Sequence, residues 1–213
     1  MLRLNSTTVD QLSISTSEKS KSHVIASSGV FQIELLEHAG EVEFPQLIEI
    51  SKSLAKEFGN KAILTKSTIH KYFNKPGSLP FIARYRNEII GYIIGVPLEA
   101  LSHEPWARLD ENFGKENTLY TYAFVIQSEY KGNGYAKMLK RVFLSWAKKR
   151  GQIKHITGHV LNGVSARFSG DIRILSRVDN WQGTGQTFEY YRRDLEPTQP
   201  SPLKNNPPLI SRT

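Results

Sequence analysis

The residues best suited to chemistry lie in one glycine-rich turn, Lys131-Gly132-Asn133-Gly134. Two glycines spaced one residue apart let the backbone turn its N–H groups inward and approach a ligand closely. The helix predicted to follow, over about residues 135–150, directs the positive end of its dipole at the same place. Three basic residues lie on or near its first turns: Lys137, Lys140 and Arg141. Together these features predict a cradle for a pyrophosphate group.

Two common nucleotide sites do not match this turn. A P-loop is not favoured, because Gly134 is followed by Tyr135 and not by Lys-Ser or Lys-Thr. A Rossmann dinucleotide site is not favoured either, because the turn lies after residue 130, no further GxxG follows, and the preceding sequence is rich in hairpin patterns.

The charge of the chain supports an anionic ligand at this place. The net charge is +8, and residues 131–154 hold eight Lys or Arg residues and no Asp or Glu. Residues 98–118, by contrast, carry a net charge of −3. The positive field is thus focused on one element, which suits a phosphorylated cofactor or a nucleic acid. The nucleic acid is the weaker hypothesis, because the charged helix face has no interleaved aromatic residues.

Composition excludes several classes of protein. The chain has 213 residues and no cysteine, which excludes a disulfide scaffold, a Cys-ligated zinc site, an iron–sulfur cluster and a thiol nucleophile. The longest apolar stretch, residues 89–98, is far short of the roughly 20 residues that span a bilayer. The first residues lack the apolar core of a secretory signal. We therefore expect no membrane partner and a cytoplasmic location.

The turn must be positioned by a single folded domain, which we expect over residues 30–195. Residues 1–29 hold eleven Ser or Thr residues and are predicted to form a flexible arm. Residues 196–213 hold five prolines and are predicted to form a tail.

Hydrophobic periodicity predicts alternating strands and helices within the domain. The expected strands cover residues 30–37, 81–86, 89–96, 119–127, 155–161, 172–181 and 187–193, with the tight turn of the first hairpin at Asn87-Glu88. The expected helices cover 45–58, 67–74 and 135–150, with a short helix within 162–170. Residues 98–118 form a long acidic insertion. This order favours an α/β or α+β fold with helices on both faces of one sheet.

At this point the chain resembles the GNAT superfamily of N-acetyltransferases. Residues 128–136 are similar to its acyl-CoA-binding signature, which is Arg or Gln, two residues, Gly, one residue, then Gly or Ala. Lys131 takes the Arg or Gln position, Gly134 the first glycine and Ala136 the final small residue. The order of elements agrees over residues 30–195.

The resemblance implies a mixed, mostly antiparallel central sheet. It also implies an acyl-transfer reaction. An acetyl or other acyl group would move from acyl-CoA, expected to be acetyl-CoA, to a primary amine, by direct attack in a ternary complex. The acceptor could be a peptide N-terminus, a lysine or a small amine. Backbone N–H groups of residues 131–137 would hold the pyrophosphate, and an N–H near Ile126 would polarise the thioester carbonyl. The implied cofactor-binding residues are Phe124, Val125, Ile126, Lys131, Gly132, Asn133, Gly134, Tyr135, Ala136, Lys137 and Asn162.

The catalytic positions depart from the family pattern. Where members often carry a Glu near the start of the central strand, this chain has Tyr120 and Tyr122. The frequent general-acid Tyr falls on Ser169. We take Tyr122 and Tyr120 as the catalytic candidates, with Tyr122 as the acid that protonates the leaving thiolate. In the alternative interpretation both rings pack on the sheet or line the acceptor pocket, and the chain binds acyl-CoA without catalysis.

Three further features carry weaker expectations. Trp106, in the acidic insertion, is a candidate lid over the acceptor site, and the insertion could attract a cationic amine. His155 and His159 share one strand face, but no third ligand is spaced for a metal, so we predict none. The closing hairpin leaves an edge available for a homodimer.

Overall fold

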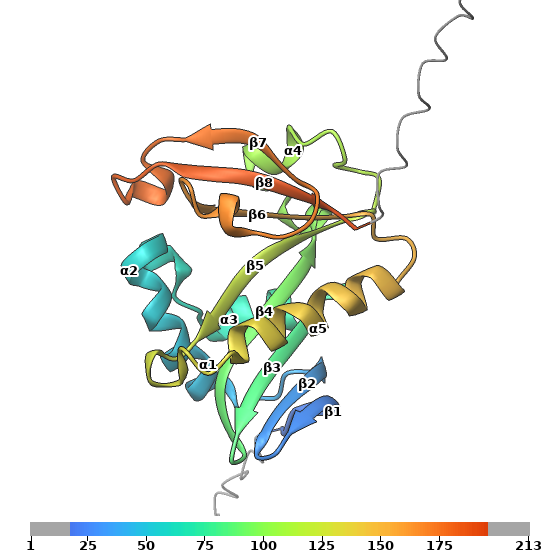
Figure 1. The fold of residues 1–213 in the computed structure, drawn as a ribbon, viewed down its shortest axis with the longest axis vertical. Helices are drawn as coiled ribbons and strands as arrows, with labels where there is room; N and C mark the ends of the chain where they lie inside the picture. Colours follow the sequence, from blue (N-terminus) through green and yellow to red (C-terminus); the bar gives the residue numbers. More distant parts are fainter. Residues whose placement is uncertain (1–17, 196–213) are drawn as a thin grey trace, which may run out of the picture.

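The fold is one sheet with helices on both faces, as predicted, but the sheet has eight strands where seven were expected. The computed structural model describes residues 18–195, so the tail of residues 196–213 and most of the expected arm lie outside the described residues. The strands run in the order β1-β2-β3-β4-β5-β6-β8-β7, and every neighbouring pair is antiparallel except β5 and β6 (Figure 1). Their bounds are β1 Lys21–Ser28, β2 Phe31–His38, β3 Leu79–Tyr85, β4 Glu88–Pro97, β5 Thr118–Ile126, β6 His155–Leu161, β7 Ile172–Val178 and β8 Phe188–Asp194.

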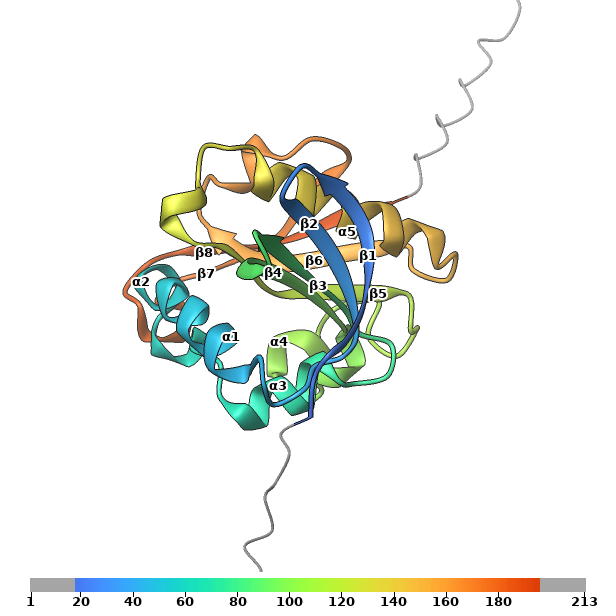
Figure 2. The same ribbon diagram turned by 90° about the horizontal axis from the view of Figure 1, so that it is seen from below.

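The helices divide between the two faces of the sheet (Figure 2). One face is covered by α1 Phe44–Ser51, α2 Ala55–Phe58 and α3 Lys66–Phe73, and the other by the single long helix α5 Tyr135–Lys149. A short helix, α4 Pro105–Arg108, lies within the acidic insertion. Each face buries its own apolar cluster against the sheet. None of these helices is both long and apolar enough to cross a membrane.

Strand β1 corrects the predicted extent of the flexible arm. Residues 21–28 pair antiparallel with β2 across a turn at Gly29, whose φ of +59° suits glycine. Most side chains of β1 are exposed, because it is an edge strand, so the serine-rich segment shows no strong hydrophobic alternation. This strand is held by backbone hydrogen bonds to β2, and such bonds leave no pattern in the sequence of β1 itself.

Local boundaries differ at three other places. The helix expected over residues 45–58 is interrupted by a 3-10 turn, Lys52–Leu54, and ends at Gly59. The tight turn between β3 and β4 has its positive φ angles at Arg86 and Asn87, one residue earlier than predicted. Strand β7 ends at Val178, and a 3-10 helix at Trp181–Gly183 leads into β8.

The central feature of the sheet is the separation of β5 from β6. Their register pairs only Thr118–Tyr120 with His155–Thr157, and beyond that point the two strands diverge (Figure 1). Gln127 N–H donates to Ile90 O of β4 at 2.9 Å. Because hydrogen-bonding direction alternates along a strand, the N–H and C=O groups of Phe124 and Ile126 face the gap. The sheet thus presents an open backbone edge inside the molecule.

Candidate active site

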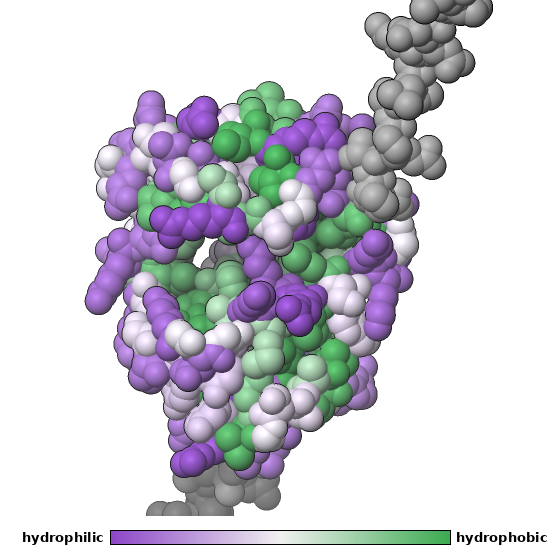
Figure 3. All heavy atoms as spheres, in the orientation of Figure 1, coloured by the Kyte–Doolittle hydropathy of each residue, from purple (hydrophilic) through white to green (hydrophobic). Residues whose placement is uncertain are grey.

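A cavity of about 570 Å³ passes through the gap between β5 and β6. Figure 3 shows the molecule hollowed between α2 and the β6–β8 part of the sheet. The lining comes from both faces of the sheet, with Leu54, Phe58 and Tyr72 on the α1–α3 side and Phe143, Leu144 and Phe168 on the α5 side. One cavity can therefore receive one reactant from each face.

A β-bulge in β5 distributes its side chains between the two faces. Ala123 pairs with Ile94 and Thr121 with Gly95, so Tyr122 is the extra residue of the bulge. Tyr120 and Tyr122 join the cluster under α1–α3, whereas Phe124 packs with the cluster under α5. The bulge therefore places the two tyrosines opposite the glycine turn.

The glycine turn leaves the start of α5 open to an anion. Gly132 and Gly134 have φ of +86° and +78°, and a Cβ at either would meet nothing within 4 Å. Gly134 is the N-cap, no side chain caps the helix, and the first backbone bond runs from Met138 N–H to Gly134 O at 3.0 Å. The N–H groups of residues 135–137 therefore have no helical partner. Such an arrangement can accept a pyrophosphate, so the predicted cradle stays a prediction.

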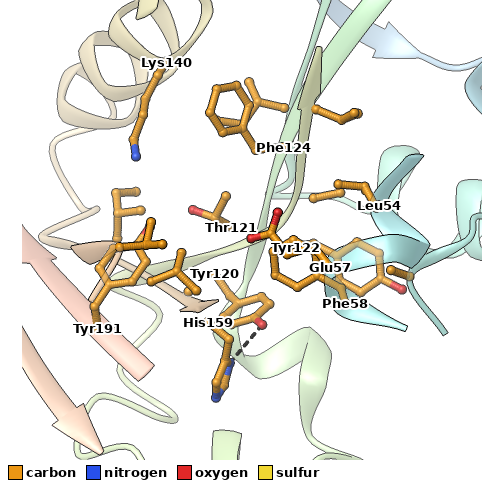
Figure 4. Close-up of a pocket in the computed structure, with 18 of the residues that line it drawn as sticks. Leu54, Glu57, Phe58, Tyr120, Thr121, Tyr122, Phe124, Lys140, His159 and Tyr191 are labelled. Atoms are coloured by element: carbon orange, nitrogen blue, oxygen red, sulfur yellow. Dashed lines mark hydrogen bonds between the residues drawn. The ribbon is translucent and has the colours of Figure 1, made fainter. Parts of the chain in front are cut away.

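Tyr120 and Tyr122 form part of the cavity wall (Figure 4). The Tyr122 ring lies 4.2 Å from that of Tyr72, between centroids, and burial raises the pKa of Tyr122. Tyr120 is buried, its hydroxyl lies 3.0 Å from His159 Nδ1, and its pKa is raised well above the ordinary value. Both phenols are therefore neutral at physiological pH and available for contact with an acceptor or for packing.

Trp106 forms part of this wall. Its ring lies 4.8 Å from the rings of both Tyr120 and His159 and 6.0 Å from that of Trp181. Its indole N–H donates to Glu104 at 3.2 Å. The acidic insertion thus supplies an aromatic side chain and a carboxylate to the cavity.

The cavity also contains two ionisable residues that the sequence does not mark as catalytic candidates. Glu57 extends from α2, and its carboxylate lies near the middle of the cavity in Figure 4. Burial raises the pKa of Glu57, and the charge of Lys131 partly offsets this effect. Lys140 extends from α5, and burial together with Arg193 lowers its pKa to about 8. Only their positions in the sequence could have indicated this. Glu57 lies three residues after Leu54 of the apolar helix stripe, and Lys140 lies one helical turn after Ala136 of the signature.

The sequence model of the Acetyltransferase (GNAT) family matches residues 45–168, more than half of the chain. The chain belongs to this family. The predicted membership is confirmed, and with it the predicted fold class. A search of curated proteins found no match.

Solved structures agree with the GNAT fold. The ribosomal-protein-S18-alanine N-acetyltransferase from Escherichia coli is 11% identical, with a TM-score of 0.56 over 79% of this chain and 96% of that one. yncA from Salmonella typhimurium, determined with its cofactor acetyl-CoA, is 12% identical, with a TM-score of 0.57 over 80% and 97%. NAA60 from Arabidopsis thaliana, in complex with a bisubstrate analogue, is 14% identical, with a TM-score of 0.55 over 72% and 94%. At these identities the likeness concerns the fold.

The residues predicted from the GNAT signature divide between the cavity lining and its surroundings. Five of them line the cavity: Phe124, Val125, Ile126, Lys131 and Ala136. The other residues of the turn, which are Gly132, Asn133, Gly134, Tyr135 and Lys137, are not part of the lining. The Tyr135 ring stacks on Phe31 at 4.2 Å, so the backbone of Tyr135, and not its ring, faces the cradle. Asn162 is exposed, lies outside the lining, and accepts a hydrogen bond from Arg177 Nε at 3.2 Å.

The two strand histidines are each engaged by other groups. His155 Nδ1 lies 2.6 Å from Asp194 Oδ1, and His159 Nδ1 is bonded to Tyr120. His159 also stacks on Trp181 at 3.7 Å. Its role in this GNAT domain is therefore to support the aromatic wall.

We expect His159 to make the domain sensitive to mild acid. Burial lowers the pKa of His159 to about 3, whereas the unfolded chain binds a proton near pH 6.5. The unfolded state therefore binds more protons below pH 6.5, and stability falls by up to about 1.4 kcal/mol per pH unit. Melting temperature measured from pH 8 to pH 5 should decline below 6.5, and this decline should be smaller in His159→Phe. The exposed His103→Gln serves as the control, and an equal decline in His159→Phe would contradict the prediction.

Proposed function

We propose that the chain is an acetyl-CoA-dependent N-acetyltransferase that acts on a primary amine by direct attack. One observation carries the proposal. The cavity through the β5–β6 gap has an uncapped helix terminus on one side and the half-buried carboxylate of Glu57, with aromatic rings, on the other. Such a cavity can hold an anionic thioester substrate and a cationic acceptor together, and holding the two reactants in place is a large part of the rate gain. The cytoplasmic location and the homodimer expected from the sequence remain proposals.

The α5 side is suited to the acyl-CoA. Backbone N–H groups of residues 134–137 would bind the pyrophosphate, and Lys131 at the turn adds a cation. The open edge of β5 offers the N–H groups of Phe124 and Ile126 to a substrate lying in the gap. One of these N–H groups would donate to the thioester carbonyl oxygen, where negative charge develops during attack.

The α1–α3 side is suited to an amine. The rings of Tyr72, Tyr122 and Trp106 and the carboxylates of Glu57 and Glu104 line it. A primary amine arrives as an ammonium ion, which carboxylates and aromatic faces attract. We propose contact with the acceptor as the role of Tyr122 and support of the wall as that of Tyr120.

Glu57 is the general base in this proposal. Glu104 already accepts from Trp106, whereas Glu57 has no hydrogen bond or ion pair among residues 18–195. Its raised pKa makes it a stronger base than an exposed carboxylate. It would remove a proton from the ammonium and so release the lone pair of nitrogen for attack.

Steady-state kinetics test direct attack. Rates measured while acetyl-CoA and the amine are both varied should show intersecting double-reciprocal lines, with no thiol release when the amine is omitted. Parallel lines with a burst of thiol would instead indicate a covalent acyl-enzyme and contradict the proposal. Binding of acetyl-CoA without thiol release would favour the alternative of a non-catalytic binding module, which Ser169 and the absence of a glutamate on β5 make worth testing.

A further inference from the structure

The proposed reaction requires a proton donor for the sulfur of the leaving group. When the carbon–sulfur bond breaks, its electron pair stays on the sulfur, which then needs a proton. Ser169, at the position of the family's frequent acid, is exposed, and its carbonyl accepts a hydrogen bond from Arg193. Tyr122 lies on the acceptor face, opposite α5. The acid must therefore come from another residue on the α5 side of the gap.

Lys140 is placed on that side. It lies in the second turn of α5, and Figure 4 shows its amine beside Phe124, directed into the cavity toward Tyr191. Lys140 Nζ lies 3.7 Å from the centroid of the Phe168 ring and 5.9 Å from that of Phe124. Among residues 18–195 it has no hydrogen bond or ion pair. Lys148 and Lys149 of the same helix are exposed.

The surroundings of Lys140 bring its pKa close to that of a thiol. Arg193 and Tyr191 line the cavity from β8, Glu57 from α2, Lys131 from the glycine turn, and Tyr120 and Tyr122 from β5. Burial and the positive charge of Arg193 lower the pKa of Lys140 to about 8. A free thiol has a pKa of about 8.5, so proton transfer between the two groups is nearly balanced in energy.

We propose that Lys140 is the catalytic acid that protonates the departing thiolate of CoA, an inference that rests on the proposed function. The amine nitrogen forms a bond to the acetyl carbon, the carbon–sulfur bond breaks, and its electron pair goes to sulfur. Lys140 Nζ gives one proton to sulfur, which yields the free thiol, and recovers a proton from solvent. Glu57 takes one proton from the acceptor ammonium before attack and later releases it to solvent, and the nitrogen loses a second proton to solvent as the amide forms. The net reaction releases one proton.

The nearest rival acid is Tyr191. It lines the same side of the cavity, its ring lies 5.2 Å from that of Phe168, and its pKa is raised by burial. Because burial raises the pKa of Tyr191 but lowers that of Lys140, the phenol is the weaker acid of the two. Tyr191→Phe and Tyr122→Phe are therefore the matched comparison variants for Lys140.

The test is the pH dependence of kcat and KM in wild type, Lys140→Met, Lys140→Arg and the two phenylalanine variants. Wild-type activity should fall above pH 8, because the amine loses the proton that it must donate. Lys140→Met should lower kcat about 100-fold, leave KM for acetyl-CoA within a few-fold, and lack the alkaline decline. Lys140→Arg should keep the charge but shift the decline beyond the measured range. If Lys140→Met fails to fold, Lys140→Gln replaces it, with the same expectation.

Several results would overturn the inference. Lys140→Met with wild-type kcat and the same alkaline decline would remove the acid role while leaving the proposed function intact. Loss of the decline in Tyr191→Phe or Tyr122→Phe, and not in Lys140→Met, would give the role to that phenol. Stoichiometric acetylation of Lys140 in the intact mass would make it a nucleophile instead. A wild-type protein that binds acetyl-CoA but acetylates no amine would overturn the proposed function and this inference together.

Discussion

Replacing Gly134 with glutamate is expected to weaken acetyl-CoA binding by about 100-fold or more, which corresponds to about 2.8 kcal/mol. Gly134 has a φ of +78°, where a residue with a Cβ is strained by about 1–2 kcal/mol. The new carboxylate would also enter the open space beside the uncapped N–H groups of α5, where the pyrophosphate is expected. Repulsion between the two anions adds to the strain. Isothermal titration calorimetry with acetyl-CoA measures the loss directly.

Gly151→Glu is the matched control for this variant. Gly151 follows α5 at its other end, has a φ of +63°, and is also surrounded by open space. The same substitution therefore imposes a similar backbone strain and the same charge, far from the turn. Its melting temperature should fall, whereas its affinity for acetyl-CoA should stay within a few-fold of wild type. Equal affinities in the wild type and both variants would show that the turn does not hold the substrate.

Glu57→Gln is expected to lower kcat/KM for the amine by about 10²–10⁴-fold, the usual contribution of a general base. Glutamine keeps the size of the side chain, so the α2 turn should fold normally. Because burial raises the pKa of Glu57, its basic form is lost at a higher pH than for an exposed carboxylate. Wild-type activity should therefore fall as pH drops through that raised pKa, and the acid limb should be absent in the variant.

Glu88→Gln provides the comparison for Glu57→Gln. Glu88 is the first residue of β4 and lies on the exposed hairpin. Glu88→Gln therefore makes the same chemical change outside the cavity. It should leave kcat/KM and its pH profile unchanged. A Glu57→Gln enzyme that keeps the wild-type rate and acid limb would remove Glu57 from the mechanism and point to Glu104 or to solvent as the base.

The features predicted correctly from the sequence are those with a local physical cause. The turn at Gly132 and Gly134 requires positive φ, and the amphipathic stripe of α5 follows from its own residues. Strand β1, by contrast, depends on pairing with β2 and has few buried side chains to mark it.

The candidate acid and base depend on the tertiary structure. Glu57 and Lys140 each lie on a helix, and the residue pattern of a helix predicts only which side chains are buried and which are solvated. They become neighbours of one cavity because β5 and β6 part after Tyr120 and because the bulge at Tyr122 changes which side chains face each helix. Neither event leaves a periodic signal in the sequence.

The most direct test of the central claim is transfer of the acetyl group itself. Wild-type protein would be incubated with acetyl-CoA and a panel of peptide N-termini, lysine peptides and small amines, and both thiol release and acetylated product would be measured. We predict amine-dependent thiol release matched by acetylated product for at least one class, and only background in Gly134→Glu. Protein that binds acetyl-CoA but releases no more thiol than Gly134→Glu with every amine would contradict the claim.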